Sequence, residues 1–340
     1  MNSEKNKICI FIIIFFLGLS NSLLLASNNA FRQNQVLGKG MNISDLEAPK
    51  LGQWGIVIHK YYFKIIKNAG FNSVRIPIRW EAHAMSSAPY TINPKFFKTV
   101  DRVIKWAFDY KLAVVINIHH YPALQHNPAS QKEEFLSLWK QISTHYKNYP
   151  DTLYFEILNE PNSNLNPKIW NVYWKEALKI IRQTNQDRTV IIDGPYWDSV
   201  WGIHLLKIPA QDKHIIVSLH YYSPMQFTHQ GASWIKGSNA WLGTTWTGTA
   251  KEKQAIINDF NEVESWAQKN NRPIYLGEFG SYSKSPMKYR VLWTTFVRKQ
   301  AEKRHWSWSY WEFCSGFGAW NPETKKWRRP LLKSLIGKAV

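Results

Sequence analysis

The sequence predicts a single-domain (β/α)8 barrel of the α/β class, and three observations support this. Short apolar runs alternate with longer amphipathic stretches along the chain after residue 30. Several runs are apolar without interruption, as in Ala113-Val114-Val115-Ile116, which is typical of parallel strands covered on both faces. The number of such units and the length of 340 residues match the usual size of this barrel.

Eight runs are predicted as strands, and nearly all end where polar or aromatic residues replace the apolar ones. In chain order they are Val36–Asn42, Ser73–Ile78, Ala113–Ile118, Leu153–Leu158, Thr189–Asp193, Ile215–Leu219, Ile274–Gly277 and Trp306–Tyr310. In a (β/α)8 barrel the side chains that follow the strands meet at one end, where the active site lies. The strand ends are therefore the first place to look for function.

Amphipathic stretches between these runs are predicted as helices. Asn93-Pro94 reads as an N-cap followed by proline at the first helical position, and the apolar stripe of Phe97, Val100 and Ile104 comes next. The other predicted helices are 57–68, 131–147, 168–184, 251–270 and 286–303. A doubly wound open sheet is the alternative, but no Gly-rich phosphate fingerprint follows a first strand.

Residues 1–26 are predicted to be a signal peptide, which leaves 27–340 as the catalytic domain. Lys5 and Lys7 precede an apolar run, and small residues follow it. Cleavage would remove Cys9, leave Cys314 as the single cysteine and thereby exclude an internal disulfide or a cysteine-rich zinc site. We expect a secreted protein without stable membrane association; a periplasmic location or an uncleaved signal anchor is the alternative.

The chain is strongly basic, with 43 Lys and Arg against 24 Asp and Glu and a formal charge of +19. The composition, 44% hydrophobic and 20% charged, excludes a disordered chain. Many basic residues fall on the predicted helix 286–303 and near the C-terminus, which indicates a solvated outer surface or adsorption to an anionic polysaccharide. No nucleic-acid motif accompanies the charge, so we expect no nucleic-acid partner.

Two glutamates stand out at predicted strand ends. Glu160 follows the fourth strand in Asn159-Glu160-Pro161, and Glu278 follows the seventh in Gly277-Glu278-Phe279-Gly280. Cleavage of a glycosidic bond needs two carboxyl groups that flank it, one to protonate the leaving oxygen and one to attack or to activate water. Strands four and seven lie across the barrel mouth from each other, so these two groups are expected to face one another.

These motifs resemble glycoside hydrolase family 5, also called cellulase family A, within a clan of (β/α)8 retaining glycosidases. The match continues in order through Arg75, His119, His220-Tyr221-Tyr222 and Trp311, and it covers nearly all of 27–340. The strings Val114–Tyr121, Phe155–Pro161 and Tyr310–Gly318 look like the family's bacterial endo-β-1,4-glucanases. The chain departs from those relatives at Ser44-Asp45 and Asn162, which puts the substrate preference in doubt.

The resemblance implies a role for each residue. Glu160 would be the general acid/base and Glu278 the nucleophile, with Arg75 favouring its negative charge. The expected substrate-binding and ordering set is Arg75, His119, His120, Asn159, His220, Tyr222, Trp311, Glu312 and Asn42, to which Trp197 and Trp234 are added from their place in predicted loops. Glu312 has a solvated carboxylate as its alternative. No cofactor is implied, and His119 with His120 is not expected to bind metal because adjacent strand residues point to opposite faces.

The 18 tryptophans divide into two groups. Sugar rings stack on aromatic faces, and Trp197, Trp234 and Trp311 are predicted to line a cleft. Trp106, Trp139, Trp170, Trp174, Trp266 and Trp293 fall in predicted helices and are expected to pack against the sheet. The main hypothesis is a monomeric endo-β-1,4-glucanase; an endo-β-mannanase, a dual-specificity enzyme and a non-catalytic carbohydrate-binding barrel remain as alternatives.

Overall fold

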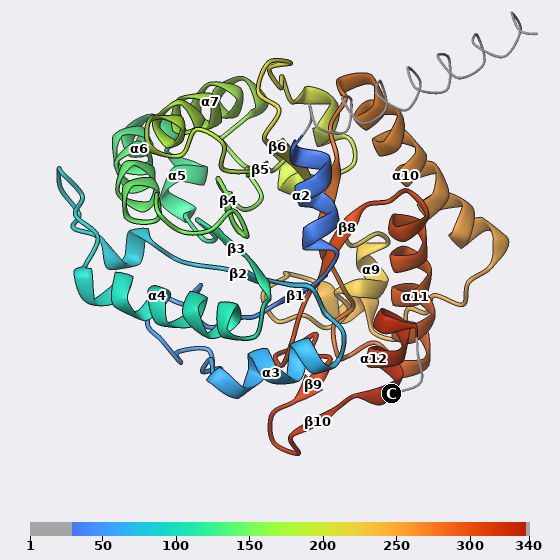
Figure 1. Ribbon diagram of the computed structural model, residues 1–340. Coiled ribbons are helices and arrows are strands. Elements are labelled where there is room, and N and C mark those ends of the chain that lie inside the picture. The colour runs from blue at the N-terminus through green and yellow to red at the C-terminus, as the bar shows by residue number, and fades with distance from the viewer. Residues whose placement is uncertain (1–28, 338–340) are drawn as a thin grey trace, which may run out of the picture.

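A computed structural model describes residues 29–337 as a closed barrel of eight parallel strands inside a ring of helices (Figure 1). The predicted signal peptide, including Cys9, lies outside the described residues. The strands are β1 Lys39–Asn42, β2 Ser73–Ile76, β3 Ala113–Asn117, β4 Leu153–Glu156, β5 Val190–Ile192, β6 Ile215–Tyr221, β7 Ile274–Phe279 and β8 Ser307–Tyr310. Because β8 pairs with β1, the (β/α)8 prediction is confirmed and the open doubly wound sheet is excluded.

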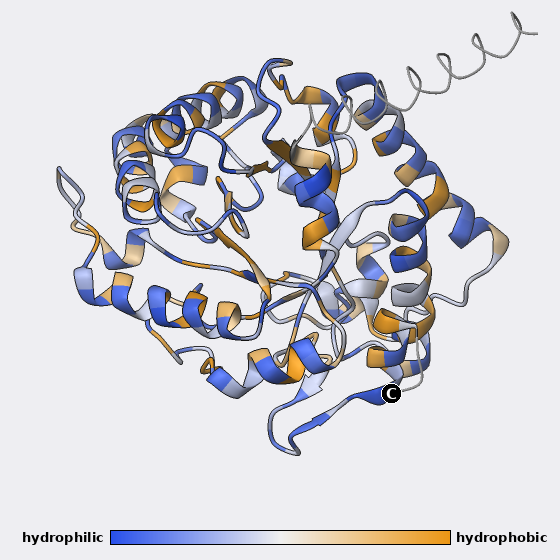
Figure 2. Ribbon diagram, viewed as in Figure 1, coloured by the Kyte–Doolittle hydropathy of each residue, from blue (hydrophilic) through white to orange (hydrophobic). Residues whose placement is uncertain are grey.

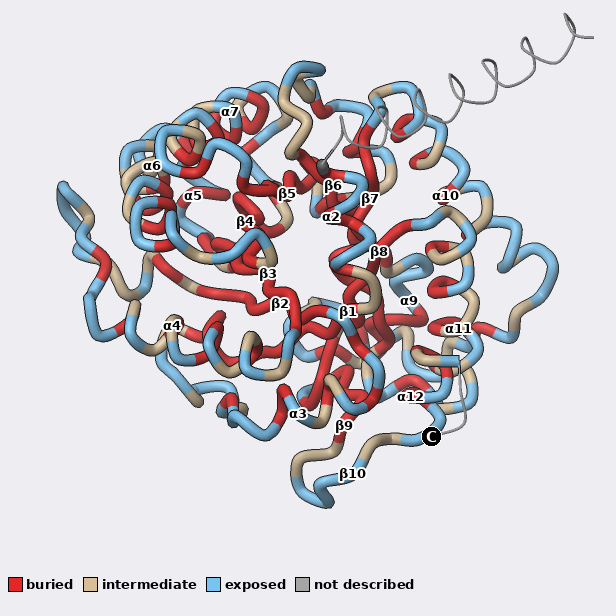
Figure 3. Tube along the Cα trace, in the orientation of Figure 1, coloured by how far each residue is buried: buried red, intermediate tan, exposed pale blue. Residues whose placement is uncertain are grey.

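The long helices other than α2 form the outer layer, and their buried, apolar residues face the strands, as the hydropathy and burial colouring shows (Figures 2 and 3). The helices are α2 Asn29–Leu37, α3 Lys60–Asn68, α4 Pro94–Asp109, α5 Pro122–His126, α6 Pro128–His145, α7 Pro167–Thr184, α8 Pro195–Asp198, α9 Met225–Thr228, α10 Ala250–Asn270, α11 Met287–Lys303 and α12 Arg329–Ile336. Only α8 and the short 3₁₀ helix η2 (Gly202–Leu205) stand between β5 and β6.

Helix α4 begins at the cap that the sequence predicts, and α10 begins at a cap that the structure reveals. The side chain of Asn93 accepts a hydrogen bond from the backbone N–H of Lys95, and Pro94 follows it at the first helical position. Thr249 and Glu252 form a reciprocal capping box at the start of α10. These local signals explain why the predicted helix boundaries fall within a few residues of the observed ones.

The start of the predicted first strand was wrong. Val36 and Leu37 belong to α2, which ends at Gly38 (φ +51°). Ala30 and Leu37 of this helix pack with Val115, Tyr154 and other residues of the barrel interior, so α2 closes the barrel at the amino ends of the strands. The apolar residues of α2 are therefore buried because the helix packs on the barrel interior, and not because they form a strand paired in the sheet.

The helical tryptophans pack as predicted. Trp139, Trp170, Trp174 and Trp293 are fully buried, Trp266 is nearly so, and Trp106 is half-buried. Trp320 and Trp327 belong to a small antiparallel pair that the sequence reading missed, β9 (Trp320–Asn321) and β10 (Lys326–Trp327). Within residues 29–337 no helix has the length and apolar character needed to cross a bilayer.

The expectation of a uniformly solvated basic helix was wrong at two positions of α11. Arg290 is buried and donates from Nη2 to the carbonyl of Phe317. Arg298 is also buried and donates from Nε to the carbonyl of Ser334 in α12. Both guanidinium groups hold the C-terminal segment against the barrel, whereas Lys299 and Lys303 of the same helix are exposed.

Candidate active site

Glu278, in β7, lies at the centre of the barrel mouth and accepts two short hydrogen bonds. Arg75 Nη1 donates to Glu278 Oε1 at 2.6 Å, and the hydroxyl of Tyr222 donates to Glu278 Oε2 at 2.7 Å. Burial alone would raise the pKa of this carboxyl, but the charges of His220 and Arg75 and the Tyr222 hydrogen bond outweigh it and hold the pKa below its usual range. Glu278 is therefore kept ionised.

Arg75 is completely buried in β2 and organises the floor of the site. Its Nε and Nη2 donate to the two oxygens of Glu156 at 2.6 and 2.5 Å, a bidentate pair. Nη2 also donates to Asn159 Oδ1 at 2.7 Å, and Nη1 to Asn42 Oδ1 at 2.9 Å. One guanidinium thus fixes side chains from β1, β4 and β7 at once.

Glu160 follows β4 and approaches Glu278 from the other side of the mouth. Its side chain is 26% exposed, and its Oε1 lies 2.8 Å from His220 Nδ1. One oxygen of Glu160 and one of Glu278 lie within 4.8 Å of each other. Burial raises the pKa of Glu160, and the hydrogen bond and charge of His220 oppose that rise. The two glutamates therefore sit in environments that push their pKa values apart.

His220 lies between the two glutamates, at a point where the pairing register of β6 and β7 shifts. Its Nδ1 is 3.7 Å from Glu278 Oε2, and its Nε2 is 3.7 Å from Asp198 Oδ2. Burial would lower the pKa of His220, but Glu278, Glu160 and Asp198 outweigh it and raise the pKa to about 9. The ring is a cation at neutral pH.

An aromatic wall stands beside the glutamates. The rings of His119 and Trp311 are stacked, with centroids 5.6 Å apart and planes within 6°. Burial, together with His120, Arg75 and His220, lowers the pKa of His119 well below its usual value, so this ring is neutral. A flat, uncharged surface of this kind suits the C–H face of a sugar.

The predicted opposite orientation of His119 and His120 was wrong. Their ring centroids are 4.6 Å apart, and His120 also makes an edge contact with Trp54. The alternation of a strand does not apply because β3 ends at Asn117. Within the described residues, the histidine that lies with carboxylates at metal-ligand spacing is His220, with Glu160 and Glu278 or with Asp193 and Asp198.

Trp197 and Trp234 are the other two predicted cleft tryptophans, and both are strongly exposed, at 56% and 59%. Trp234 makes a T-shaped contact with Tyr282, and His229 makes T-shaped contacts with both Trp234 and Tyr222. His229 is therefore linked to the site through two rings, and the sequence reading did not include it. Exposed indoles in loops after β5 and β6 are available to a ligand.

Two residues predicted to touch substrate are used internally instead. Asn42 is fully buried; its Nδ2 donates to the carbonyl of Gly277, while its Oδ1 accepts from Arg75. Glu312 is buried rather than solvated, and its oxygens accept backbone N–H bonds from Cys314 at 2.9 Å and Ser315 at 2.7 Å. Glu312 therefore shapes the loop after β8, and Asn42 steadies Arg75.

The sequence reading missed four buried acids near the site. Glu156 was hidden in the run Leu153–Leu158, and Asp193 and Asp198 follow β5. Glu47 is buried after β1, where burial first and then Glu312 and Glu278 raise its pKa to about 8. A carboxyl group next to or inside an apolar run is the signal that would have pointed to the first two.

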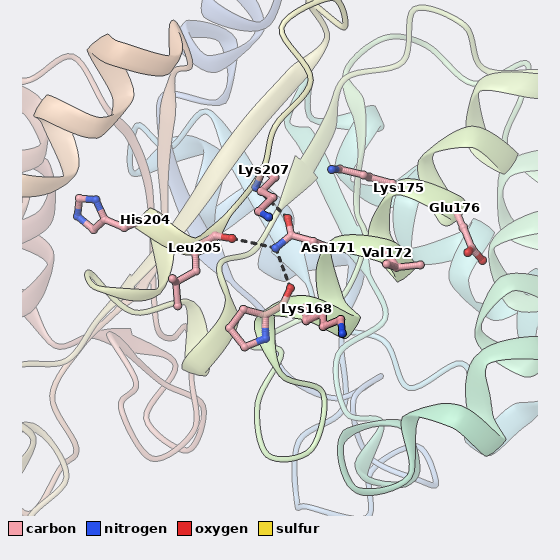
Figure 4. Close-up of a pocket in the computed structure, with 9 residues that line it drawn as sticks. Lys168, Asn171, Val172, Lys175, Glu176, His204, Leu205 and Lys207 are labelled. Atoms are coloured by element: carbon pink, nitrogen blue, oxygen red, sulfur yellow. Dashed lines mark hydrogen bonds between the residues drawn. The ribbon is translucent and has the colours of Figure 1, made fainter.

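A hollow of about 670 Å³ lies elsewhere, on the outside of the barrel between α7 and η2 (Figure 4). Asn171 closes its floor by donating to the carbonyls of Pro167 and Leu205 at 2.7 and 2.8 Å. Its rim carries Lys168, Lys175 and Lys207. It is not joined to the two glutamates and has no pair of facing carboxylates.

Comparison with known proteins agrees with this geometry. Residues 32–316 match the family model described as cellulase (glycosyl hydrolase family 5). Endoglucanase H of Acetivibrio thermocellus is 34% identical over 313 residues, which cover 90% of this chain but only 33% of that protein, so the chain spans about a third of this relative.

Two solved structures of Cel5A from Thermotoga maritima are also similar. The complex with cellobiose is 51% identical and the complex with mannotriose 50%, each with a TM-score of 0.89. Both comparisons cover 90% of this chain and 99% of the other. The whole barrel, rather than the site alone, is therefore shared.

Proposed function

The chain belongs to glycosyl hydrolase family 5 and is a glycoside hydrolase, and we propose that it is a retaining endo-β-1,4-glucanase. The spacing of the two carboxyl groups carries the proposal. One oxygen of Glu160 lies within 4.8 Å of one of Glu278. Retaining enzymes hold the two groups about 5–5.5 Å apart, whereas inverting enzymes need about 6.5–9.5 Å to admit a water molecule.

In the first step, Glu278 attacks the anomeric carbon while Glu160 protonates the departing oxygen. Arg75 and Tyr222 hold Glu278 ionised and aimed, through the contacts of 2.6 and 2.7 Å. The raised pKa of Glu160 keeps a proton available for the leaving group. The products are a glycosyl ester on Glu278 and a free reducing-end fragment.

In the second step, Glu160 acts in the reverse sense. It removes a proton from water, which attacks the anomeric carbon and releases Glu278. Two inversions at one carbon leave the β configuration in the product. Asn159 is placed by Arg75 to hold the 2-hydroxyl of the sugar, a contact that strengthens in the transition state.

The aromatic surfaces support a polymeric substrate. Trp311 and His119 form a stacked pair, and Trp197 and Trp234 add exposed indoles in the loops after β5 and β6. Several sugar units can stack along such a surface, which favours attack inside a chain. A monomer is sufficient, because every proposed group comes from this chain.

The activity is tested by a product profile on soluble glucan and mannan. We expect carboxymethylcellulose to lose viscosity early, with a mixture of short oligosaccharides as products, because internal bonds are cut. Release of a single small sugar from chain ends would contradict endo-cleavage. No hydrolysis of either polymer by the folded protein would contradict the proposal itself.

An endo-β-mannanase or dual activity is the second candidate, and one observation favours it. The Thermotoga maritima Cel5A structures, about half identical to this chain, include complexes with cellobiose and with mannotriose. Comparable kcat/KM values on glucan and mannan would show dual specificity. A strong preference for mannan would replace the glucanase proposal.

The pKa shifts predict a bell-shaped pH dependence of kcat/KM. Glu278 must be ionised, and its lowered pKa places the acid limb below the usual glutamate range. Glu160 must hold a proton, and its raised pKa places the basic limb above that range. The observed limbs belong to the coupled group of Glu160, His220 and Glu278 rather than to single residues. Rates that stay flat from acid to strongly alkaline pH would contradict this pairing.

We propose that the protein is exported and that residues 1–26 are removed. The support is the basic start and the apolar run in the sequence. Mass spectrometry of the protein recovered outside the producing cell should give an N-terminus near Ser27. Intact residues 1–26 on membrane-bound protein would instead show an anchor.

A further inference from the structure

The loop after β5 contains an unusual turn. Tyr196, Trp197 and Asp198 all have left-handed backbone, with φ of 58°, 61° and 52°. Side chains of this size rarely adopt positive φ, and three in succession persist only where the surroundings enforce them. One such constraint is Gly202, where an added Cβ would lie 2.0 Å from the carbonyl oxygen of Pro195.

This turn is tied to the segment that carries Glu160. The backbone N–H of Trp197 donates to the carbonyl of Pro161 at 3.2 Å. The backbone N–H of Glu160 itself donates to Asp193 Oδ2 at 3.0 Å, from the residue just after β5. The backbone around Glu160 is therefore held from the β5 side by two hydrogen bonds.

The left-handed conformation points Trp197 and Asp198 in opposite directions. Trp197 is exposed, whereas Asp198 is 1% exposed and faces His220. Asp198 Oδ1 accepts from the backbone N–H of Gly194 at 2.5 Å, which fixes the carboxyl group. Its Oδ2 and the His220 Nε2 lie 3.7 Å apart, an ion-pair contact rather than a hydrogen bond, and neither atom forms a hydrogen bond within the described part of the chain.

His220 is consequently surrounded by acids. Glu160 after β4 and Glu278 in β7 face Nδ1, and Asp198 faces Nε2. Asp193 lies in the same cluster, with a ligand atom within 4.8 Å of those of Asp198 and His220. Arg75, the cation at the floor of the site, binds Glu278 on the side away from Tyr222. Carboxyl groups at both ring nitrogens stabilise the doubly protonated ring.

We propose that Asp198 is a positioning residue for the general acid/base: it holds His220 as an imidazolium whose Nδ1–H is directed at Glu160. This inference rests on the proposed role of Glu160. Burial raises the pKa of Asp198 to about 7, while the charge of His220 opposes that rise. When ionised, Asp198 places a negative charge 3.7 Å from His220 Nε2, which favours keeping the proton between His220 Nδ1 and Glu160 Oε1, 2.8 Å apart. The strained turn is the device that brings this carboxylate under His220.

Asp198→Asn tests the proposal, since it removes the charge and keeps an acceptor for Gly194. A nearby negative charge raises the pKa of the proton held between Glu160 and His220, and Asp198→Asn removes that charge. The basic limb of the kcat/KM profile should therefore move to lower pH by about one unit. On cello-oligosaccharides, whose leaving groups need protonation, kcat/KM at neutral pH should fall about tenfold or more. On a dinitrophenyl cellobioside it should fall less than about threefold.

A structural role alone would reduce kcat/KM equally on both substrates and leave the basic limb in place, and that result overturns the proposal. Asp187→Asn is the matched control: Asp187 lies 3.5 Å from His214 Nε2, before β5 and outside the site, and this variant should match the parent in both assays. If Asp198→Asn does not fold, ¹⁵N NMR of the histidine rings in the parent protein decides. One buried ring should stay doubly protonated to about pH 8, and its absence overturns the proposal.

The roles of Glu160 and Asp198 can be tested separately. If Glu160→Ala shows no dependence on the leaving group, the assignment of the acid/base is wrong. If Glu160→Ala shows that dependence and a folded Asp198→Asn does not, the assignment stands and only the role of Asp198 is wrong.

Discussion

Glu278→Gln is expected to lower kcat on carboxymethylcellulose by about 10⁵-fold or more, a loss of the size seen when a catalytic nucleophile is removed. The amide has nearly the shape of the carboxylate but cannot form the glycosyl ester. Reducing ends released per enzyme molecule over hours provide the measurement. Glu323→Gln, a change at an exposed glutamate in the loop between β9 and β10, should leave the rate unchanged.

Glu278→Gln also tests the charge balance around the buried Arg75. Arg75 donates to both Glu156 and Glu278, so the amide leaves the buried guanidinium with one fewer counter-charge. Removing one partner of a buried pair is destabilising by about 3–5 kcal/mol where the remaining charge is uncompensated, and Glu156 reduces that cost here. We therefore expect a lower Tm but a folded protein. Normal turnover by folded Glu278→Gln would show that another group is the nucleophile.

Glu160→Ala is expected to separate substrates by their leaving groups. Natural glucans need a proton on the departing oxygen, so kcat/KM should fall by about 10²–10⁴-fold. The dinitrophenolate of an aryl glycoside leaves without protonation, so the rate of the first step, in which the sugar is transferred to Glu278, should change by less than about tenfold. Stopped-flow release of dinitrophenol should show a fast burst and then slow turnover, because the second step still lacks its base.

Equal losses on both substrates, with no burst, would contradict the acid/base role of Glu160. Azide provides an independent check, because a small anion can replace the missing base without needing deprotonation. It should accelerate the slow second step of Glu160→Ala and give a β-glycosyl azide. An α product would indicate direct displacement on the free substrate.

Most of the barrel follows from local patterns. Fully apolar runs such as Ala113–Ile116 identify strands covered on both sides, and caps such as Asn93-Pro94 identify helix starts. Val36-Leu37 could not be assigned this way, because a short apolar pair before Gly38 is consistent with both a strand and a helix end. Its burial against Val115 and Tyr154 comes from distant parts of the chain.

Some residues of the site can also be predicted from local sequence patterns, and others cannot. Glu160 and Glu278 follow predicted strands and belong to short motifs, so the sequence points to both. Glu312 and Asn42 also lie at strand ends, but only the structure shows that their polar atoms are already bonded within the protein. The place of Glu156 inside an apolar run marks it as unusual, but only the structure shows that it pairs with Arg75.

The position of Asp198 beside His220 could not be predicted from the sequence. Nothing in Tyr196-Trp197-Asp198 predicts three left-handed residues, and without that turn the carboxylate would not reach His220. The turn depends on Gly202, which follows it in the same loop, and on the backbone of Pro161, which lies in the loop after β4. Contacts of this kind are set by tertiary packing.

The central claim is that Glu278 and Glu160 perform a double displacement. Proton NMR of a cello-oligosaccharide digest, recorded within the first minutes before mutarotation, tests it most directly. The anomeric signal of the new reducing end should appear first as the β form, with the α form growing in later. First appearance of the α form would mean a single inversion and would contradict the mechanism derived from the close approach of the two carboxyl groups, within 4.8 Å.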